Sequence, residues 1–298
     1  MHRPTLYLFL VCLPAILSTQ DYGWWNDTHD WDGVSPWRSY LTLASAYMGP
    51  NALPVPEIRN GRITQGTELR VAGDAHFGDG DDTQNLYLQG HVPLFSDRVG
   101  LHLQYVPLEH YRMSAATRDE RAARDYDGEG LAGGDVYVGT HIQLVQDHAH
   151  WPDLLLSINL KTASGNRLSA ARYTDTPGYY FDLSAGKTFE REGSLASLRP
   201  HALLGFYVWQ TFMDNYYQND AVLYGLGCDF RFRKLTLTPA LGGYYGYLDI
   251  GDRPLVGRLD LRTQRDRGME YFARLQHGFA DYPYSTVRLG VTFHYARQ

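Results

Sequence analysis

The C-terminal stretch Arg288-Leu289-Gly290-Val291-Thr292-Phe293-His294-Tyr295 decides the fold class of this 298-residue chain. Odd positions from Val287 to Tyr295 are apolar or aromatic, and even positions from Thr286 to His294 are polar or glycine. Successive side chains of a β-strand point to opposite faces, so the stretch predicts a strand with one apolar and one polar face. Such a strand suits the wall of a membrane barrel or the last strand of a soluble β-sandwich.

The order of residue types in this stretch favours the membrane barrel. A polar residue, a glycine and two aromatic residues stand at Arg288, Gly290, Phe293 and Tyr295. This order resembles the C-terminal assembly signal of Gram-negative outer-membrane β-barrels. The resemblance implies an outer-membrane protein with two partners, the surrounding lipids and the barrel-assembly machinery. It also implies that the last strand closes the barrel against the first.

Upstream of this strand, the same alternation of apolar and polar residues recurs from Gly66 onward. Between the predicted strands lie turn residues, and the total is about twelve strands, an even number as in single-chain bacterial barrels. The sequence therefore predicts an all-β fold, a transmembrane antiparallel up-and-down β-barrel. The apolar faces of the predicted strands begin at Leu69, Leu86, Val99, Val136, Leu154, Tyr179, Ala202, Val222, Leu235, Leu255, Tyr271 and Val287.

The lengths of the connections agree with this topology. If the first strand runs outward from the periplasm, the two longest gaps, 114–133 and 165–177, both fall outside. Outer-membrane barrels have short periplasmic turns and longer external loops. Aromatic residues of the apolar faces also gather at both ends of the strands, as the two girdles of a membrane barrel require.

The N-terminal sequence predicts a targeting segment followed by an extension. A basic start at Arg3, a short apolar run and the small residues near Ser18 predict a cleaved secretory signal peptide over residues 1–20. Residues 21–62 are rich in Trp, Asp, Gly and Pro and have no clear period. We expect them to form an extension that lies in the periplasm or folds into the barrel mouth as a plug. The barrel then occupies residues 63–298.

Composition excludes several classes of function. The formal net charge of −6 argues against nucleic acid as a partner. Cys12 lies in the predicted signal peptide, so Cys228 would be the only cysteine of the mature chain, which excludes an intramolecular disulfide. A mean hydropathy of −0.38 is compatible with a membrane barrel because half of each strand faces a polar lumen.

The polar faces of the strands contain the candidate functional residues. They would line a pore that selects solutes by charge and hydrogen bonding, and the arginines of the last three strands would form a basic ladder favouring anions. The alternative is that these groups pair with one another and fill a narrow barrel. The predicted lumen-lining residues are Arg70, Asp74, His102, Lys161, Asp182, Arg258, Arg262, Arg274 and Arg288.

No pattern predicts a metal, a cofactor or catalysis. His76, His91, His102 and His141 share the inward face, but we expect them at different heights in the barrel. Outer-membrane phospholipases, which resemble this chain in size, need a His and a Ser facing lipid, with an Asn that orients the His. The nearest substitute is His277 and Ser285, expected diagonally across the last hairpin without an Asn. We therefore predict that the protein is not an enzyme.

A second resemblance covers about a tenth of the chain. Asn159-Leu160-Lys161-Thr162-Ala163-Ser164-Gly165, followed by a loop and Gly178-Tyr179-Tyr180-Phe181-Asp182, is similar to strands of uptake barrels of the phenol-degradation type. Those barrels usually have a Pro before the Thr-Gly, which is missing here, so their substrates cannot be carried over. The sequence favours a porin-like channel or transporter for a small solute or an apolar compound, with the solute unknown. A non-conducting structural or adhesion barrel and an outer-membrane lipid hydrolase are the alternatives.

Overall fold

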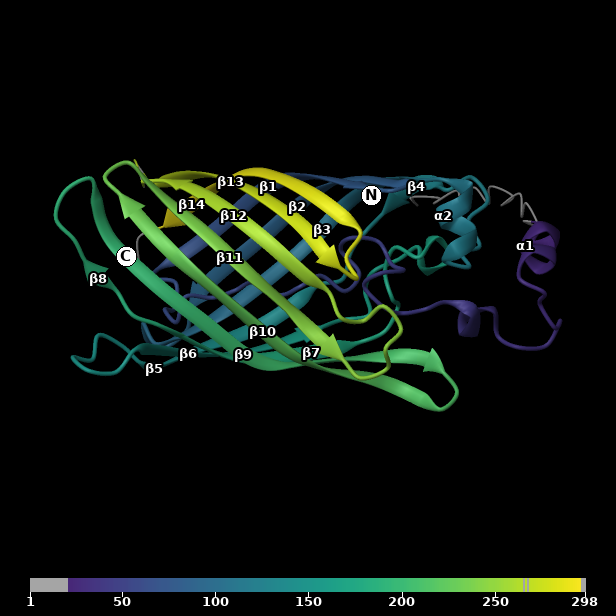
Figure 1. The fold of residues 1–298 in the computed structure, drawn as a ribbon, viewed down its shortest axis with the longest axis horizontal. Coiled ribbons are helices and arrows are strands. Elements are labelled where there is room, and N and C mark those ends of the chain that lie inside the picture. Colours follow the sequence, from purple (N-terminus) through teal and green to yellow (C-terminus); the bar gives the residue numbers. More distant parts are fainter. Residues whose placement is uncertain (1–20, 265, 267, 296–298) are drawn as a thin grey trace, which may run out of the picture.

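The computed structural model describes residues 21–264, 266 and 268–295, so the predicted signal peptide lies outside the described residues. Within them, twelve antiparallel strands form one closed barrel, and two short strands pair with barrel strands near the two ends of the barrel. This arrangement confirms the predicted all-β fold and the predicted number of strands (Figure 1).

The strands follow one another around the barrel in sequence order. The twelve barrel strands are β1 (Thr67–Gly78), β2 (Asp81–Pro93), β3 (Val99–Met113), β5 (Tyr137–Val145), β6 (Asp153–Lys161), β7 (Gly178–Gly186), β9 (Leu195–Met213), β10 (Tyr216–Phe232), β11 (Leu235–Gly246), β12 (Leu255–Thr263), β13 (Met269–Ala280) and β14 (Tyr284–Tyr295). The two short strands are β4 (Glu129–Ala132), which pairs with β3, and β8 (Phe189–Glu190), which pairs with β9. The helical segments are α1 (Gly23–Thr28), α2 (Ala115–Glu120) and the 3-10 turns η1 (Trp37–Tyr40) and η2 (Leu168–Ala170).

Pairing of the last strand with the first closes the barrel. β14 lies antiparallel to β1 along its whole length, from Thr67 opposite Tyr295 to Gly78 opposite Tyr284. Gly290 permits a close approach at this seam, because a Cβ there would lie 2.5 Å from the carbonyl oxygen of Val71 and 2.6 Å from the ring of Phe272. The glycine of the predicted assembly signal therefore has a packing role in the wall.

The alternation seen in the sequence divides the side chains between the outside of the barrel and its lumen. On β14, Val287 and Leu289 are exposed on the outside of the barrel, whereas Arg288 and Thr292 are buried inside. Further apolar side chains exposed on the wall are Leu86, Leu103, Leu160, Leu183, Leu204, Leu226, Leu259 and Leu275. Exposed aromatic side chains mark both ends of the strands, with Phe189, Tyr271 and Tyr295 at one end and Phe77, Tyr179 and Phe279 at the other.

The two ends of the barrel differ in their connections. One end, here called the short-turn end, has the turns between β2 and β3, β5 and β6, β10 and β11, and β12 and β13, together with the turn that contains β8. The opposite long-loop end has both long connections, residues 114–136 and 162–177. Short turns face the periplasm in outer-membrane barrels, so we expect the long-loop end to be the external end.

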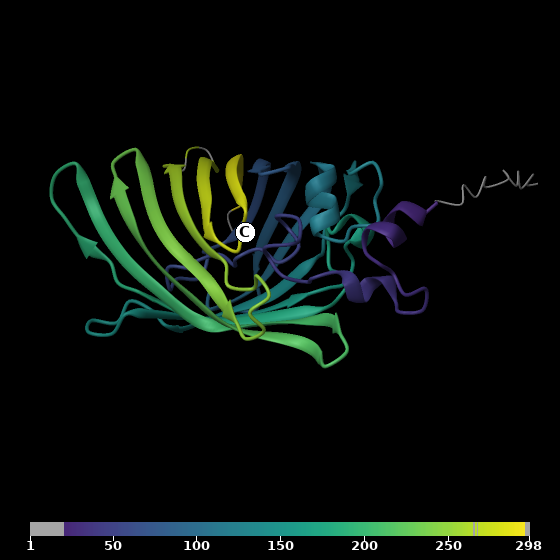
Figure 2. The ribbon, with the colours of Figure 1, turned by 45° about the vertical axis from the view of Figure 1, so that its right-hand side comes forward.

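The N-terminal segment passes through the barrel instead of staying at one end. Residues 21–40 lie beyond the long-loop end, where α1 and η1 are seen outside the barrel (Figure 2). There the Trp25 indole nitrogen donates to the Ala122 carbonyl at 2.9 Å, and Arg38 pairs with Asp175 at 3.2 Å. Residues 41–64, here called the luminal segment, then run inside the barrel to the short-turn end, where β1 begins. The extension therefore has two parts, one beyond the long-loop end and one inside the barrel.

None of the helices in the described part of the chain is long and apolar enough to span a membrane.

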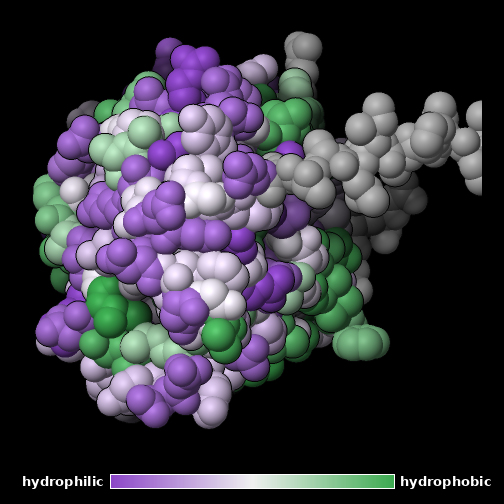
Figure 3. All heavy atoms as spheres, turned by 90° about the vertical axis from the view of Figure 1, so that its right-hand side faces the viewer, coloured by the Kyte–Doolittle hydropathy of each residue, from purple (hydrophilic) through white to green (hydrophobic). Residues whose placement is uncertain are grey.

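A buried polar network fixes the loop 162–177 to the long-loop end of the wall. The Arg172 guanidinium, which is fully buried, donates to Glu109 at 2.8 Å and to Asp81 at 2.7 Å. Burial alone would lower the pKa of Arg172, but Glu109 and Asp81 raise it above its ordinary value, so the side chain is permanently charged. Arg121, from the other long loop, also pairs with Asp81 at 2.6 Å. The surface at this end is predominantly hydrophilic (Figure 3).

The position of residues 21–40 predicts a labelling pattern on cells. In a Cys228→Ser background, we expect Val34→Cys to react with a membrane-impermeant maleimide on intact cells, because Val34 is 87% exposed beyond the long-loop end. The matched control is Asp97→Cys, in the exposed turn between β2 and β3 at the short-turn end. It should react only after the outer membrane is permeabilised. Protection of Val34→Cys on intact cells would contradict this placement.

The Arg172 network predicts a large loss of stability when its cation is removed. Arg172→Leu leaves the buried Glu109 without its cationic partner and removes one of the two cations that contact Asp81. We therefore expect the free energy of unfolding to fall by about 3 kcal/mol. The control is Arg112→Leu, which breaks the exposed pair between Arg112 and Glu129 and should cost about 0.5 kcal/mol or less. Urea unfolding in detergent, followed by tryptophan fluorescence, measures both. Equal losses would mean that the buried network does not hold the loop.

Candidate functional site

The candidate functional site is the barrel interior, where the luminal segment contacts the wall at three levels. At the long-loop end the contact is mainly apolar. The Trp209 indole nitrogen on β9 also donates to the Leu43 carbonyl at 2.8 Å. The buried side chains of this level are Leu41, Leu43, Met48 and Ala52 of the luminal segment, packed with Met113, Ala123, Leu168 and Ala171 of the strand and loops.

In the middle of the barrel the luminal segment meets arginines of the wall. Arg258 on β12 donates to the Val55 and Pro56 carbonyls at 2.6 and 2.7 Å. Arg274 on β13 contacts the Glu57 carboxylate through both terminal nitrogens, at 2.5 and 2.8 Å. The positive charge of Arg274 offsets the cost of burying this carboxylate in the barrel interior.

Two glycines of the wall form a seat for Ile58, the next residue of the luminal segment. Gly225 on β10 and Gly242 on β11 are directly opposite each other in the sheet. A Cβ added at Gly225 would lie 2.9 Å from the Ile58 side chain, and one added at Gly242 would lie 2.6 Å from it. The wall thus lacks side chains where Ile58 packs. The next residue, Arg59, pairs with the buried Asp182 of β7 at 3.0 Å.

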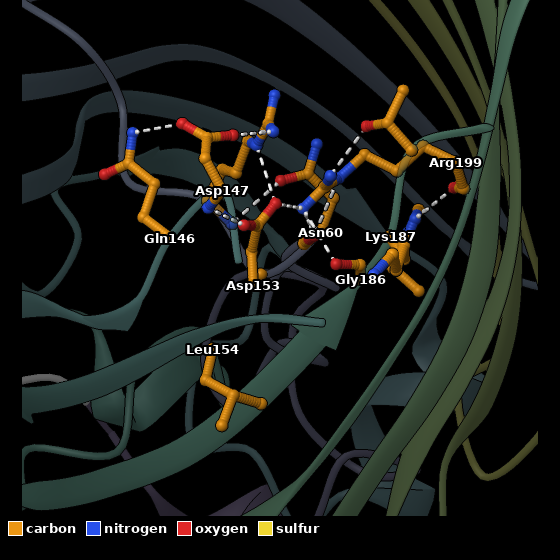
Figure 4. A network of polar contacts seen from close by, with 12 residues as sticks. Asn60, Gln146, Asp147, Asp153, Leu154, Gly186, Lys187 and Arg199 are labelled. Carbon is orange, nitrogen blue, oxygen red and sulfur yellow. Dashed lines mark hydrogen bonds and ion pairs between the residues drawn. The ribbon is translucent and has the colours of Figure 1, made fainter. Parts of the chain in front are cut away.

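The luminal segment leaves the barrel at the short-turn end through a polar network centred on Asp153 (Figure 4). Asp153 on β6 accepts hydrogen bonds from Arg62 at 2.8 Å and from Arg199 at 2.9 Å. Arg199 also donates to the Asn60 carbonyl at 2.8 Å. Between these contacts, Gly61 has a φ of +83°, and a Cβ there would lie 2.6 Å from the wall backbone at Gly186. The segment therefore runs directly against the wall here.

Little space remains inside the barrel. A cavity of about 50 Å³ lies beside Glu57, Arg258, Arg274 and Tyr137. A second, of about 300 Å³, lies closer to the short-turn end and is bordered by Arg59, Arg70, His102 and Arg262. Residues of the luminal segment line both cavities.

The structure places all nine predicted lumen-lining residues on the inner face of the wall, but most are paired. Arg288 contacts Asp74 at 2.7 Å, and Lys161 contacts Asp135 at 2.6 Å. Asp182, Arg258 and Arg274 contact the luminal segment as described above. Arg70 and Arg262 border the larger cavity, with Arg262 3.5 Å from Asp229. The arginines of the last three strands therefore do not form an open basic ladder, because their guanidinium groups donate to carboxylates and backbone carbonyls.

The inward histidines are closer together than the sequence suggested. His91 and His102 are opposite each other on β2 and β3, and the ring of His141 stacks on that of His102 with centroids 4.7 Å apart. His91 and His102 are equally far in sequence from the turn at Ser96-Asp97, so a count of residues from that turn would have predicted their pairing. The Nε2 atoms of His102 and His141 are buried without a hydrogen-bond partner. The described residues contain no group of three or more His, Cys, Asp or Glu side chains arranged to hold a metal ion.

On the lipid face, His277 and Ser285 are direct neighbours and not diagonal ones. They face each other across β13 and β14, with His277 Nδ1 2.8 Å from Ser285 Oγ. A turn centred on Asp281 pairs them in this register. Among the described residues, no amide or carboxylate hydrogen-bonds the second ring nitrogen of His277. The pair therefore lacks the group that would orient the base of a hydrolase.

Sequence reasoning missed the residues that the luminal segment contributes, above all Glu57, Ile58 and Arg59. The segment is irregular and contains Pro50, Pro54 and Pro56, so no period shows which side chains meet the wall. The pairs of opposite charge between 57–62 and the inward face of the strands were the available signal.

Comparison with known proteins shows the fold. No protein-family model matches the chain, and no curated protein matches it. The chain is similar in structure to the COG4313 outer membrane channel from Pseudomonas putida F1, with a TM-score of 0.58 and 13% identity over 81% of this chain and 100% of that one. The KdgM porin gives a TM-score of 0.47 and 11% identity, covering 76% and 99% of the two chains. The transport unit of the autotransporter AIDA-I from Escherichia coli gives 0.47 and 9%, covering 78% and 91%. The likeness to the Pseudomonas putida channel and the closed barrel show the fold, an antiparallel β-barrel of the kind found in outer-membrane proteins.

Proposed function

We propose that the protein is an outer-membrane channel for a small solute or an apolar compound, and that its luminal segment closes it. The observation that carries this proposal is the occupant of the lumen. A continuous stretch of chain that belongs to no strand fills the interior, whereas the barrels of eight strands are filled by side chains of the wall itself. Apart from its covalent link to β1 at the short-turn end, the segment is held in the lumen by non-covalent contacts. It can therefore leave the lumen, and a pore would remain.

The contacts of the luminal segment with the wall support reversible binding of the segment inside the barrel. The glycines at 225 and 242 leave room for Ile58, and in an unplugged barrel they would widen the lumen at the same height. The polar contacts at Glu57, Arg59 and Arg62 are ion pairs, which water can replace when the segment leaves. The similarity to the Pseudomonas putida channel supports the proposal at the level of the fold only.

The second candidate is a non-conducting barrel whose luminal segment is a permanent core. The buried Arg172 network favours this reading, because it fixes the long loop over the end where the segment enters. The external loops 114–133 and 165–177 would then be the working surface. For both candidates we propose that the signal peptide is cleaved and that the barrel wall contacts outer-membrane lipids. We also propose that the assembly machinery recognises the signal formed by Arg288, Gly290, Phe293 and Tyr295. The similarity to uptake barrels of the phenol-degradation type stays a prediction.

The channel proposal predicts that a wall substitution at the seat opens the pore. Gly242→Ala places a methyl group against Ile58, so we expect single-channel openings in planar bilayers at least about tenfold more often than for the unchanged protein. The matched control is Gly73→Ala on β1, where nothing lies within 4 Å of the added Cβ. It should leave the opening frequency unchanged.

The same recordings distinguish the two candidates. Both variants must retain the heat-modifiable gel mobility of a folded barrel. Silence of folded Gly242→Ala, like that of Gly73→Ala, would contradict a seat from which the segment is released and would favour the permanent core.

A further inference from the structure

The charge balance around Glu57 points to the class of solute. Three guanidinium groups lie together on the inner face of β12, β13 and β14, at Arg258, Arg274 and Arg288. The wall supplies only two carboxylates within ion-pair distance of them among the described residues. Asp260 contacts Arg274 at 2.6 Å, and Asp74 contacts Arg288 at 2.7 Å. The third carboxylate is Glu57 of the luminal segment.

The luminal segment also supplies two further acceptors of this cluster. The terminal nitrogens of Arg258 donate to two carbonyl oxygens, those of Val55 and Pro56, and its Nε donates to Gln276 at 2.7 Å. When the segment leaves, both terminal nitrogens of Arg258 lose their acceptors, and Arg274 loses a two-point contact with a carboxylate. Buried donors without acceptors are costly, and the planar fork of an arginine matches a carboxylate in two-point geometry. The empty site would therefore attract an oxyanion.

The surroundings of the cluster favour an anion with an apolar body. The residues that precede Glu57 in the luminal segment include Leu53 and Val55, and both are buried. They pack in one cluster with aromatic residues of the wall, among them Tyr137, Tyr180 and Tyr282. The luminal segment thus presents an apolar stretch followed by a carboxylate, and the wall matches both parts.

We infer that the cluster of Arg258, Arg274 and Arg288 is a binding site for an organic carboxylate with an apolar body, and that Glu57 occupies it as an internal competitor. This inference rests on the proposed channel function and adds its solute class. Entry of such a solute would replace Glu57 on Arg274 and favour release of the luminal segment, since only one carboxylate can occupy the fork. The solute would then promote its own passage.

The test is binding of phenylacetate to the folded full-length protein in detergent, measured by isothermal titration calorimetry. Glu57→Gln removes the competing charge, so we expect it to bind phenylacetate about tenfold or more tightly than the unchanged protein, as for the loss of one charge-assisted contact. Adding Arg274→Gln to Glu57→Gln should abolish the binding. The control Arg59→Gln loosens the segment at Asp182 without altering the cluster, so its gain should be smaller than that of Glu57→Gln.

Two further ligands separate the parts of the inference. Acetate has the carboxylate without the apolar body and should bind more weakly than phenylacetate, and phenethylammonium has the opposite charge and should not bind. Equal affinity of Glu57→Gln for phenylacetate and phenethylammonium, or unchanged affinity in the Arg274→Gln double variant, would overturn the inference.

Bilayer recordings of the same variants keep the two proposals apart. Openings of Glu57→Gln that phenylacetate does not affect, with no binding in calorimetry, would overturn the carboxylate site and leave the channel standing. Binding that depends on Arg274, in a protein that never conducts, would overturn the channel and show the arginine cluster to be a carboxylate site in a closed barrel.

Discussion

The whole structure depends on one constraint, the need to satisfy every backbone hydrogen bond of a sheet within hydrocarbon. Lipid offers no partner for a free strand edge, so the sheet must close on itself. Here the closure is the full-length pairing of β14 with β1, from Thr67 opposite Tyr295 to Gly78 opposite Tyr284. Once the sheet is closed, alternation places one half of the side chains in lipid and the other half in the interior. The interior then has to be filled by water, by side chains or by another part of the chain.

This protein fills its interior with its own N-terminal residues, and the composition of the wall follows from that choice. The wall has glycines where Ile58 packs, a carboxylate that pairs with Arg59 and an arginine that pairs with Glu57. The ion pairs offset the cost of burying charge on both sides, but each is also a contact that a competing ion can replace. A purely apolar plug would lack this property. The polar lumen is therefore compatible with both a stable closed state and a route to release.

Period-two alternation was enough to predict the twelve strands of the closed barrel. Arg288 and Asp74 were correctly placed inside because parity alone determines the face of a strand residue. The heights of residues along the barrel axis were harder to predict, because they depend on the register and stagger of neighbouring strands. For this reason the stacking of His141 on His102 and the direct pairing of His277 with Ser285 were not predicted. A plug formed by residues 21–62 was one of two expectations, but the contacts of the luminal segment with the wall could not be predicted. Glu57 and Arg274 are 217 residues apart in the chain, and no local pattern indicates a contact over such a separation.

The central claim is that the luminal segment is all that closes a pore. The most direct measurement is the single-channel conductance of protein that lacks residues 21–62, compared with the complete mature chain in the same bilayers. We predict steady conductance for the shortened protein and rare openings for the complete one. Absence of current in both, with the circular dichroism and heat-modifiable mobility of a folded barrel retained, would contradict the claim and identify a barrel that does not conduct.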